Sequence, residues 1–408
     1  MSTNEPSVPA HVPPELVQPI PFQDAPGIER DASGAMDVFR DDRPIVYAPA
    51  SRRGMGSWVL KSYELIHEAF HTPELFSSDR YSGFSALLGE DWPMPPMEYD
   101  PPHHQPFRVL LQPLFTPKRM ATLEDGVSET VRELLARLRP QGRCEFQSTF
   151  GVPLPTTVFL RLVGLPLEDA PTLLVWERQL MHGETLDERI AGARSIKEYL
   201  LGHIRERERN PQDDMISYIV NAEVEGRRLT PDEKLGICFL LYGAGLDTVA
   251  AALGLSFGFL ARNPERQQDL RNDPDQRPRA IEEMLRATMN IVPGRRLTQD
   301  TVFHGVEMKK GDFVALPTMF ANRDSAEFPD ATKIDFAREN AAQHLSFGTG
   351  AHNCLGKHLA RRELRIALDA WLDEMPPFRL GPGELVTYGG TVFGVTSLDL
   401  EWSAPTAA

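Results

Sequence analysis

One cysteine of the chain stands in a glycine-rich loop that leads directly into a helical pattern. The loop reads Phe347-Gly348-Thr349-Gly350-Ala351-His352-Asn353-Cys354-Leu355-Gly356, and helical periodicity follows from Lys357. Backbone N–H groups and the positive end of a helix dipole stabilise a thiolate, which suits an axial ligand on haem iron. Gly350 and Gly356 are expected to let the backbone pass close to a flat macrocycle. The structural alternative is a buried cysteine in a turn, the usual fate of a single cysteine.

Asp247 and Thr248 form a second candidate pair because they lie in an apolar stretch. Between Leu235 and Ala261 the only charged residue is Asp247. An unpaired carboxylate in an apolar core is costly, so Asp247 needs either a partner or a chemical task. The alternative is that Thr248 donates to the carbonyl of Ala244, four residues earlier, and that Asp247 only pairs with a nearby cation.

Two further polar motifs are weak signals when each is taken alone. The segment Glu283-Met284-Leu285-Arg286 places a carboxylate and a guanidinium on one face of a predicted helix. By itself this spacing is typical of a surface ion pair, which contributes little to stability. The segment Asp100-Pro101-Pro102-His103-His104-Gln105-Pro106-Phe107-Arg108 reads by itself as a polar turn.

Together and in this order, the four motifs resemble the signatures of the cytochrome P450 superfamily, the haem-thiolate monooxygenases. The resemblance runs from about Pro13 to Trp402 and is most specific for the soluble bacterial camphor-hydroxylase-like branch. It implies a mainly α fold with a small β-sheet region. The expected shape is a triangular single domain, with haem b between a long central helix and the cysteine loop.

The resemblance also implies roles for individual residues. Cys354 is expected to ligate the iron, and Asp247 and Thr248 to serve dioxygen activation, with Asp247 helping to bring in protons. Glu283 and Arg286 are expected to join Arg338 in a buried ion network. The expected cofactor-binding residues are His104, Arg108, Ala244, Arg295, Phe347, Gly348, His352, Cys354 and Gly356. The expected substrate-binding residues are Phe84, Trp92, Met94, Met181, Leu240, Gly243, Ala244, Ile291, Val292, Thr391 and Val392.

The implied reaction is hydroxylation of a small apolar substrate with dioxygen. Electrons are expected from NADH through a ferredoxin reductase and an acidic [2Fe-2S] ferredoxin. Trp92 or Met94 stands where camphor hydroxylase has a tyrosine, so we expect a terpenoid or norisoprenoid of roughly ten to fifteen carbons in place of camphor. The ferredoxin is expected to dock on a basic patch beside the cysteine loop. Its residues are Arg108, Lys118, Arg119, Lys357, Arg361 and Arg362.

Two other functions remain open at this stage. One is a peroxide-driven peroxygenase, and the other is a non-catalytic haem-based binding or sensor protein. Neither needs an acid and alcohol pair, so the presence of Asp247 and Thr248 disfavours both.

Composition agrees with a large globular protein of the cytoplasm. The chain has 408 residues, of which 41% are hydrophobic and 25% charged, and its net charge is −15. This charge disfavours nucleic acid and anionic membranes as partners. Three widely spaced cysteines indicate neither a disulfide framework nor a structural zinc site, which favours a reducing compartment. We expect Cys144 in a polar loop and Cys238 in the core.

The elements that must position these residues are mainly helices. The apolar stretch 235–261 begins after Thr230-Pro231-Asp232-Glu233, which is typical of the start of a soluble helix, so we predict a buried helix and no membrane span. Other amphipathic helices are predicted at 122–138, 173–181, 190–205, 277–289 and 358–372. Short strands are predicted at 45–47, 58–60, 301–303 and 313–316. The Pro-rich residues 1–25 are expected to form an extended tail, and residues 26–408 a single domain.

Overall fold

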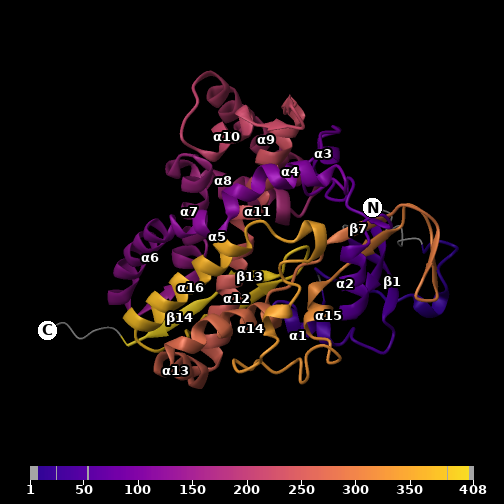
Figure 1. The fold of residues 1–408 in the computed structure, drawn as a ribbon. Coiled ribbons are helices and arrows are strands. Elements are labelled where there is room, and N and C mark those ends of the chain that lie inside the picture. The colour runs from indigo at the N-terminus through magenta and orange to yellow at the C-terminus, as the bar shows by residue number, and fades with distance from the viewer. Residues whose placement is uncertain (1–7, 24, 53–54, 384, 404–408) are drawn as a thin grey trace.

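Helices dominate the computed structural model, which describes residues 8–23, 25–52, 55–383 and 385–403. The outline is roughly triangular, with helices on the left and at the top and a strand-rich corner on the right (Figure 1). The α-helices are α1 (Ala32–Asp37), α2 (Tyr63–His71), α3 (Phe84–Leu87), α4 (His104–Leu111), α5 (Pro117–Ala121), α6 (Glu124–Leu138), α7 (Pro153–Val163), α8 (Ala170–His182), α9 (Leu186–Arg209), α10 (Met215–Asn221), α11 (Pro231–Leu246), α12 (Thr248–Arg262), α13 (Pro264–Asn272), α14 (Arg277–Thr288), α15 (Thr318–Asn322) and α16 (Lys357–Glu374).

The strands form small sheets at the edges of the helical body. The largest sheet has the order β1-β2-β10-β7-β3, in which β2 and β10 are parallel and the other neighbours antiparallel. A second sheet has the order β11-β14-β4, and the remaining strands pair as hairpins. The strands are β1 (Ile45–Arg52), β2 (Met55–Leu60), β3 (Phe76–Ser77), β4 (Arg143–Glu145), β5 (Glu223–Val224), β6 (Arg227–Arg228), β7 (Gly294–Leu297), β8 (Thr301–Phe303), β9 (Val306–Met308), β10 (Phe313–Ala315), β11 (Phe378–Leu380), β12 (Val386–Tyr388), β13 (Gly394–Ser397) and β14 (Asp399–Trp402). The expected fold class, mainly α with a small β component, is confirmed.

The long central helix is present but interrupted. It begins with a capping box, in which Thr230 and Glu233 each accept from the other's backbone N–H, as the sequence predicted. The helix is broken at Asp247, where α11 ends and α12 begins, so the single predicted helix is corrected to two. Residues 231–262 are long and apolar enough to cross a membrane, yet two-thirds of their most apolar window is buried inside the fold. This burial agrees with a core helix.

The remaining predicted helices are present, and their ends differ by a few residues from the sequence pattern. The helix predicted at 173–181 runs from Ala170 to His182, and the one predicted at 190–205 runs from Leu186 to Arg209. The earlier start at Leu186 follows from a second capping box, formed by Thr185 and Glu188. Apolar periodicity marks the buried middle of a helix, whereas polar caps decide where the helix begins.

The N-terminal segment packs against the fold instead of extending from it. Its residues Val12, Ile20, Phe22 and Ala25 are buried in the core cluster around the five-stranded sheet. A one-turn helix, η1 (Pro14–Leu16), interrupts the extended backbone, since proline fits the first helical position. The described part of this segment is therefore largely extended, and the buried apolar side chains among its prolines pack it against the fold. Residues 1–7 and 24 of that expected tail lie outside the described residues.

Of the expectations for the two other cysteines, the one for Cys238 is confirmed and the one for Cys144 is wrong. Cys238 lies on α11 and is buried in the core, as expected. Cys144 does not lie in a polar loop. It lies on β4, where it pairs with Leu400 and is 7% exposed. The alternating burial of this short strand turns the cysteine inward, although its neighbours in sequence are polar.

Candidate active site

The cysteine loop is closed by hydrogen bonds of its own backbone and side chains. The Cys354 N–H donates to the Phe347 carbonyl at 2.9 Å, and the Asn353 amide donates to the Gly348 carbonyl at 2.7 Å. Gly350 has a φ of +68°, and a Cβ there would collide with the carbonyl oxygen of Phe70 at the end of α2. The close approach of α2 therefore requires a glycine here, and the expected role of Gly350 beside a macrocycle stays a prediction.

Residue Cys354 is exposed, although protein atoms surround its thiol closely. Burial among these atoms raises the pKa of the thiol. The backbone N–H groups of Gly356 and Lys357, at the start of α16, and the positive charge of Arg108 act in the opposite direction. These are the helix-start interactions that the sequence predicted for a thiolate.

Four basic residues from three separate segments converge at this loop. His104 and Arg108 lie on α4, Arg295 lies on β7, and His352 precedes the cysteine by two residues. The rings of His104 and His352 lie 4.6 Å apart, and the charges of Arg108 and Arg295 both act on His352. The chain therefore builds an electropositive corner from groups that are far apart in sequence.

This corner fits the carboxylates of a haem. Both ring nitrogens of His104 are buried and have no hydrogen-bond partner among the described residues. Burial and the charge of Arg108 lower the pKa of His104 to about 4, so its ring is neutral and offers one N–H donor. Two arginine charges and this neutral donor match two propionates, since buried donors need acceptors.

The central helix offers open space near its break. Ala244 is exposed although most of α11 is buried, and a Cβ built at Gly243 would have nothing within 4 Å. Thr248 donates from its hydroxyl to the Ala244 carbonyl at 3.0 Å. This hydrogen bond is the one that the structural alternative predicted, and it is typical of a locally bent helix.

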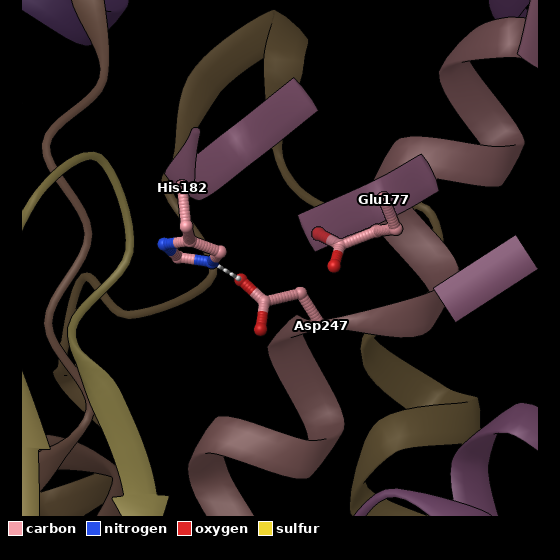
Figure 2. Close-up of side chains that lie close together, drawn as sticks. All are labelled: Glu177, His182 and Asp247. Carbon is pink, nitrogen blue, oxygen red and sulfur yellow. Dashed lines mark ion pairs between the residues drawn. The ribbon is translucent and has the colours of Figure 1, made fainter. Parts of the chain in front are cut away.

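Asp247 lies at the centre of a polar cluster that joins three elements (Figure 2). Its Oδ1 accepts from the hydroxyl of Tyr388, on β12, at 3.0 Å. Its Oδ2 lies 3.7 Å from Nε2 of His182, the last residue of α8. Glu177, also on α8, completes the cluster, and its carboxyl group is directed toward Asp247. The sequence indicated His182 only as a residue near the expected relay, and it gave no signal for Glu177 or Tyr388.

Apart from Gly243 and Ala244, described above, the expected substrate residues divide into two groups. Five of them, Phe84, Trp92, Met94, Met181 and Leu240, belong to the core cluster around α11. Trp92 and Met94 are only 4% and 1% exposed, so they offer little surface to a ligand. The second group lies where the segment before β7 meets the segment before β13.

This second group is held together by backbone contacts. Ile291 bridges Val392, and the Val292 N–H donates to the Thr391 carbonyl at 2.8 Å. Thr391 itself is exposed, whereas Val392 is buried.

The Glu283 and Arg286 pair is a buried ion network, not a surface pair. Arg286 donates from Nε and Nη2 to the two Glu283 oxygens at 2.7 and 2.8 Å, and both side chains are fully buried. Arg338 donates to Glu283 at 3.1 Å. Arg286 also donates to the carbonyls of Asn322 and Ala331. The network ties α14 to the segments that precede the cysteine loop.

The expected basic patch is partly neutralised by acidic neighbours. Arg361 on α16 donates to Glu282 at 2.7 Å, and Arg362 forms an ion pair with Glu124. Lys118 and Arg119, on α5, are exposed and form no ion pair within the described ranges. Helix α5 packs against α16, so these two cations lie near the helix that follows the cysteine loop.

Comparison with known proteins gives consistent matches over the whole chain. The family model "Cytochrome P450" matches residues 175–375. "Probable cytochrome P450 127A1" of Sinorhizobium fredii is 40% identical and covers 97% of each chain. The crystal structure of cytochrome P450 CYP101C1 superposes with a TM-score of 0.86 at 34% identity, covering 98% of this chain and 100% of that chain. The crystal structure of CYP101J2 superposes with a TM-score of 0.85 at 32% identity, covering 97% and 99%.

These matches confirm the family resemblance on which the sequence interpretation depended. Members of this family are haem b enzymes that use dioxygen, small substrates and redox partners. The expected branch is also confirmed, since two of the matched structures carry the CYP101 name. The chain therefore belongs to the cytochrome P450 family of haem-thiolate monooxygenases, in its bacterial camphor-hydroxylase-like branch.

Proposed function

We propose that the protein hydroxylates a small apolar terpenoid or norisoprenoid, with Cys354 as the ligand of the haem iron. The observation that carries the cofactor site is the convergence of the Cys354 thiol with His104, Arg108, Arg295 and His352. When bound, haem b supplies the iron at which dioxygen is activated. Arg108 and Arg295 balance the charge of the propionates, and His104 and His352 donate to them. Phe347, Gly348, Gly356 and Ala244 border the cofactor in this proposal.

Asp247 and Thr248 would manage protons at the break between α11 and α12. Because the Thr248 hydroxyl donates to Ala244, its oxygen lone pairs remain to accept a hydrogen bond from water or another donor in the pocket. Asp247 supplies protons at the break between α11 and α12. The presence of this pair favours a monooxygenase over a peroxygenase or a binding protein.

The substrate lies against half-buried apolar groups near the break. Phe84, Met181, Leu240, Gly243 and Ile291 keep exposed surface, whereas Trp92 and Met94 support them from behind. None of the eleven expected lining residues is cationic. A pocket of this kind favours an apolar molecule of roughly ten to fifteen carbons with one or two polar groups and disfavours a carboxylic acid.

Electrons reach the haem from NADH through a ferredoxin reductase and an acidic [2Fe-2S] ferredoxin that docks near α5 and α16. The exposed Lys118 and Arg119 support this proposal. We place the protein in the cytoplasm, since Cys144, Cys238 and Cys354 are all unpaired.

A panel of terpenoids, norisoprenoids, fatty acids and aromatic acids tests the substrate class. The spin-state shift of the haem reports binding, and product analysis with NADH, reductase and ferredoxin reports turnover. We expect ionone-like ketones to shift the spin state with micromolar dissociation constants and to give hydroxylated products. A response confined to fatty or aromatic acids contradicts the proposed substrate class, and binding without product contradicts the proposed reaction.

A further inference from the structure

The groups around Asp247 suggest how its protons are replaced. We propose that Glu177 and His182 form a proton relay from solvent to Asp247, with Tyr388 as the residue that positions the Asp247 carboxylate. This inference rests on the proposed function, since it takes Asp247 as the proton donor of the oxygen chemistry. It adds Glu177 and Tyr388, for which the sequence gave no signal, and it gives His182 a defined role.

The geometry brings the three ionisable side chains within one small volume. A carboxylate oxygen of Glu177, a ring nitrogen of His182 and a carboxylate oxygen of Asp247 lie within 4.8 Å of one another (Figure 2). This is close enough for a proton to pass between them directly or through one water. His182 and Glu177 come from the same helix, α8, which ends beside the break between α11 and α12. The relay therefore exists only when α8 packs next to that break.

Exposure decreases along the cluster from one end to the other. The His182 side chain is 33% exposed, the Asp247 side chain 12%, and Glu177 7%. His182 can therefore exchange protons with solvent, whereas Glu177 cannot do so directly. Glu177 Oε1 and Asp247 Oδ2 are buried and lack hydrogen-bond partners in the described part of the chain. Buried oxygens without a donor are costly, so a proton carried by one of the two carboxyl groups, or a water between them, would lower this cost.

Tyr388 holds Asp247 without exchanging protons. Burial and the charge of Asp247 raise the pKa of Tyr388 well above 10, so its hydroxyl remains a donor at all working pH values. A Cβ at Gly394, the partner of Tyr388 in the β12–β13 hairpin, would collide with that hydroxyl. The His182 ring packs edge-on against the Tyr388 ring at 4.9 Å. Tyr388 therefore orients both Asp247 and His182.

Protonation states agree with this arrangement. Burial, together with the charge of Asp247, raises the pKa of Glu177 to about 8, so Glu177 holds a proton at pH 7. Burial disfavours the charged ring of His182, but the carboxyl groups of Asp247 and Glu177 outweigh it and raise the pKa of His182. The other ionisable groups that act on the pair are Arg178 of α8, which opposes the charged His182, and Tyr242 of α11, near Glu177. Both carboxyl groups therefore have a proton source beside them.

The proton balance of the reaction sets what the relay must supply. Each turnover takes one substrate, one dioxygen, two electrons from the redox partner and two protons, and it yields the hydroxylated product and one water. When Asp247 gives a proton to the pocket, its carboxylate takes one from the Glu177 carboxyl or from Nε2 of His182. The group that gave the proton is restored through His182, which takes one from solvent.

Infrared spectroscopy of the holoenzyme tests directly whether Glu177 holds a proton, with EDTA present to exclude divalent cations. We expect a C=O band of a protonated carboxyl at pH 7 that shifts in D2O and disappears above about pH 8. The wild-type minus Glu177→Gln difference spectrum isolates this band, whereas Glu129→Gln, at an exposed position of α6, leaves it unchanged. If Glu177→Gln removes no carboxyl band at pH 7, Glu177 does not hold the proton and the relay is wrong.

Kinetics test whether the proton held by Glu177 is used in turnover. General acid catalysis is worth about 100- to 10,000-fold. With NADH, reductase, ferredoxin and β-ionone as the probe, we therefore expect His182→Gln and Glu177→Gln each to slow NADH consumption by about 100-fold at pH 7, the lower end of that range. The solvent isotope effect should rise in both. The wild-type rate should fall above about pH 8, and Glu177→Gln should lose this fall whereas Glu177→Asp restores it. His203→Gln, a histidine of α9 outside the cluster, serves as the matched control.

A different result is expected if Glu177 and His182 only hold α8 against the break and transfer no proton. In that case the variants would slow the reaction equally at every pH, with an unchanged isotope effect, and the relay would be wrong. If both variants had the same pH dependence of the rate as the wild type, the relay would also be wrong. The carbon monoxide spectrum and Thr248→Ala test the proposed function separately: if they behave as expected while the relay variants do not, only the relay fails.

Discussion

The Thr248 hydroxyl donates a 3.0 Å hydrogen bond to the Ala244 carbonyl across the break between α11 and α12. This bond fixes the hydroxyl rotor, so the oxygen of Thr248 keeps its lone pairs available to accept a hydrogen bond. The same bond would also occur in a merely bent helix. Mutation of Thr248 and Asp247 distinguishes the two roles.

Thr248→Ala should uncouple electron consumption from hydroxylation. NADH should still be consumed, but the electrons should appear as hydrogen peroxide because the pocket loses the acceptor that orients a proton donor. Asp247→Asn keeps the size of the side chain and should slow turnover, with product per NADH less affected. The measurement is the ratio of product to NADH with peroxide assayed alongside, and Thr248→Ser serves as the control. A fully coupled Thr248→Ala would make the helix bend the better account of this residue.

Cys354→Ala should abolish the thiolate-type carbon monoxide band. The two other cysteines are buried elsewhere, on β4 and in the core face of α11, and cannot replace it. Cys144→Ala and Cys238→Ala should therefore keep the band. Loss of the band in Cys238→Ala, or its survival in Cys354→Ala, would show that the ligand assignment is wrong.

Glu283→Gln should destabilise the protein strongly. The substitution leaves Arg286, which is fully buried, and Arg338 without their carboxylate, and breaking a buried ion pair in this way costs about 3–5 kcal/mol. Chemical unfolding and haem retention measure the effect. Glu265→Gln, at an exposed position of α13, is the matched control and should change the free energy of unfolding by less than about 0.5 kcal/mol.

Stability should fall as the pH rises because of Glu363, a buried residue of α16. Burial raises its pKa from 4.5 to about 8, so between these values the folded protein holds a proton that the unfolded chain has lost. The free energy of unfolding therefore decreases with pH in this window. Glu363→Gln should reduce the difference between the unfolding midpoints at pH 5 and pH 8. An unchanged difference would mean that Glu363 does not titrate as proposed.

Ferredoxin association should depend on α5 more than on Arg362. Arg362 is already paired with Glu124, whereas Lys118 and Arg119 are exposed. Arg119→Glu should slow association more than Arg362→Glu, and the wild-type rate should fall steeply with salt because the Debye length is only about 8 Å at physiological ionic strength. Stopped-flow electron transfer over a range of salt concentrations measures both effects. A rate that neither salt nor Arg119→Glu changes would exclude this docking surface.

The sequence by itself determined the family, the fold class and the elements that carry the motifs. Local patterns were sufficient for this because a capping box at Thr230, a glycine-rich loop before Cys354 and an isolated Asp247 in an apolar stretch are all short-range features. The same patterns did not give the helix break at Asp247, since periodicity runs through it without change. They also misjudged Cys144, whose burial depends on distant partners.

Only the tertiary structure decided which groups surround Asp247. Tyr388 lies 141 residues away in sequence, and its hydroxyl reaches the carboxylate from the β12–β13 hairpin. The paired residue Gly394 has no side chain to collide with that hydroxyl. Glu177 looks like an ordinary glutamate of an amphipathic helix until α8 packs beside the break and buries it. Burial and neighbouring charge set the protonation of such groups, and both are properties of packing and not of local sequence.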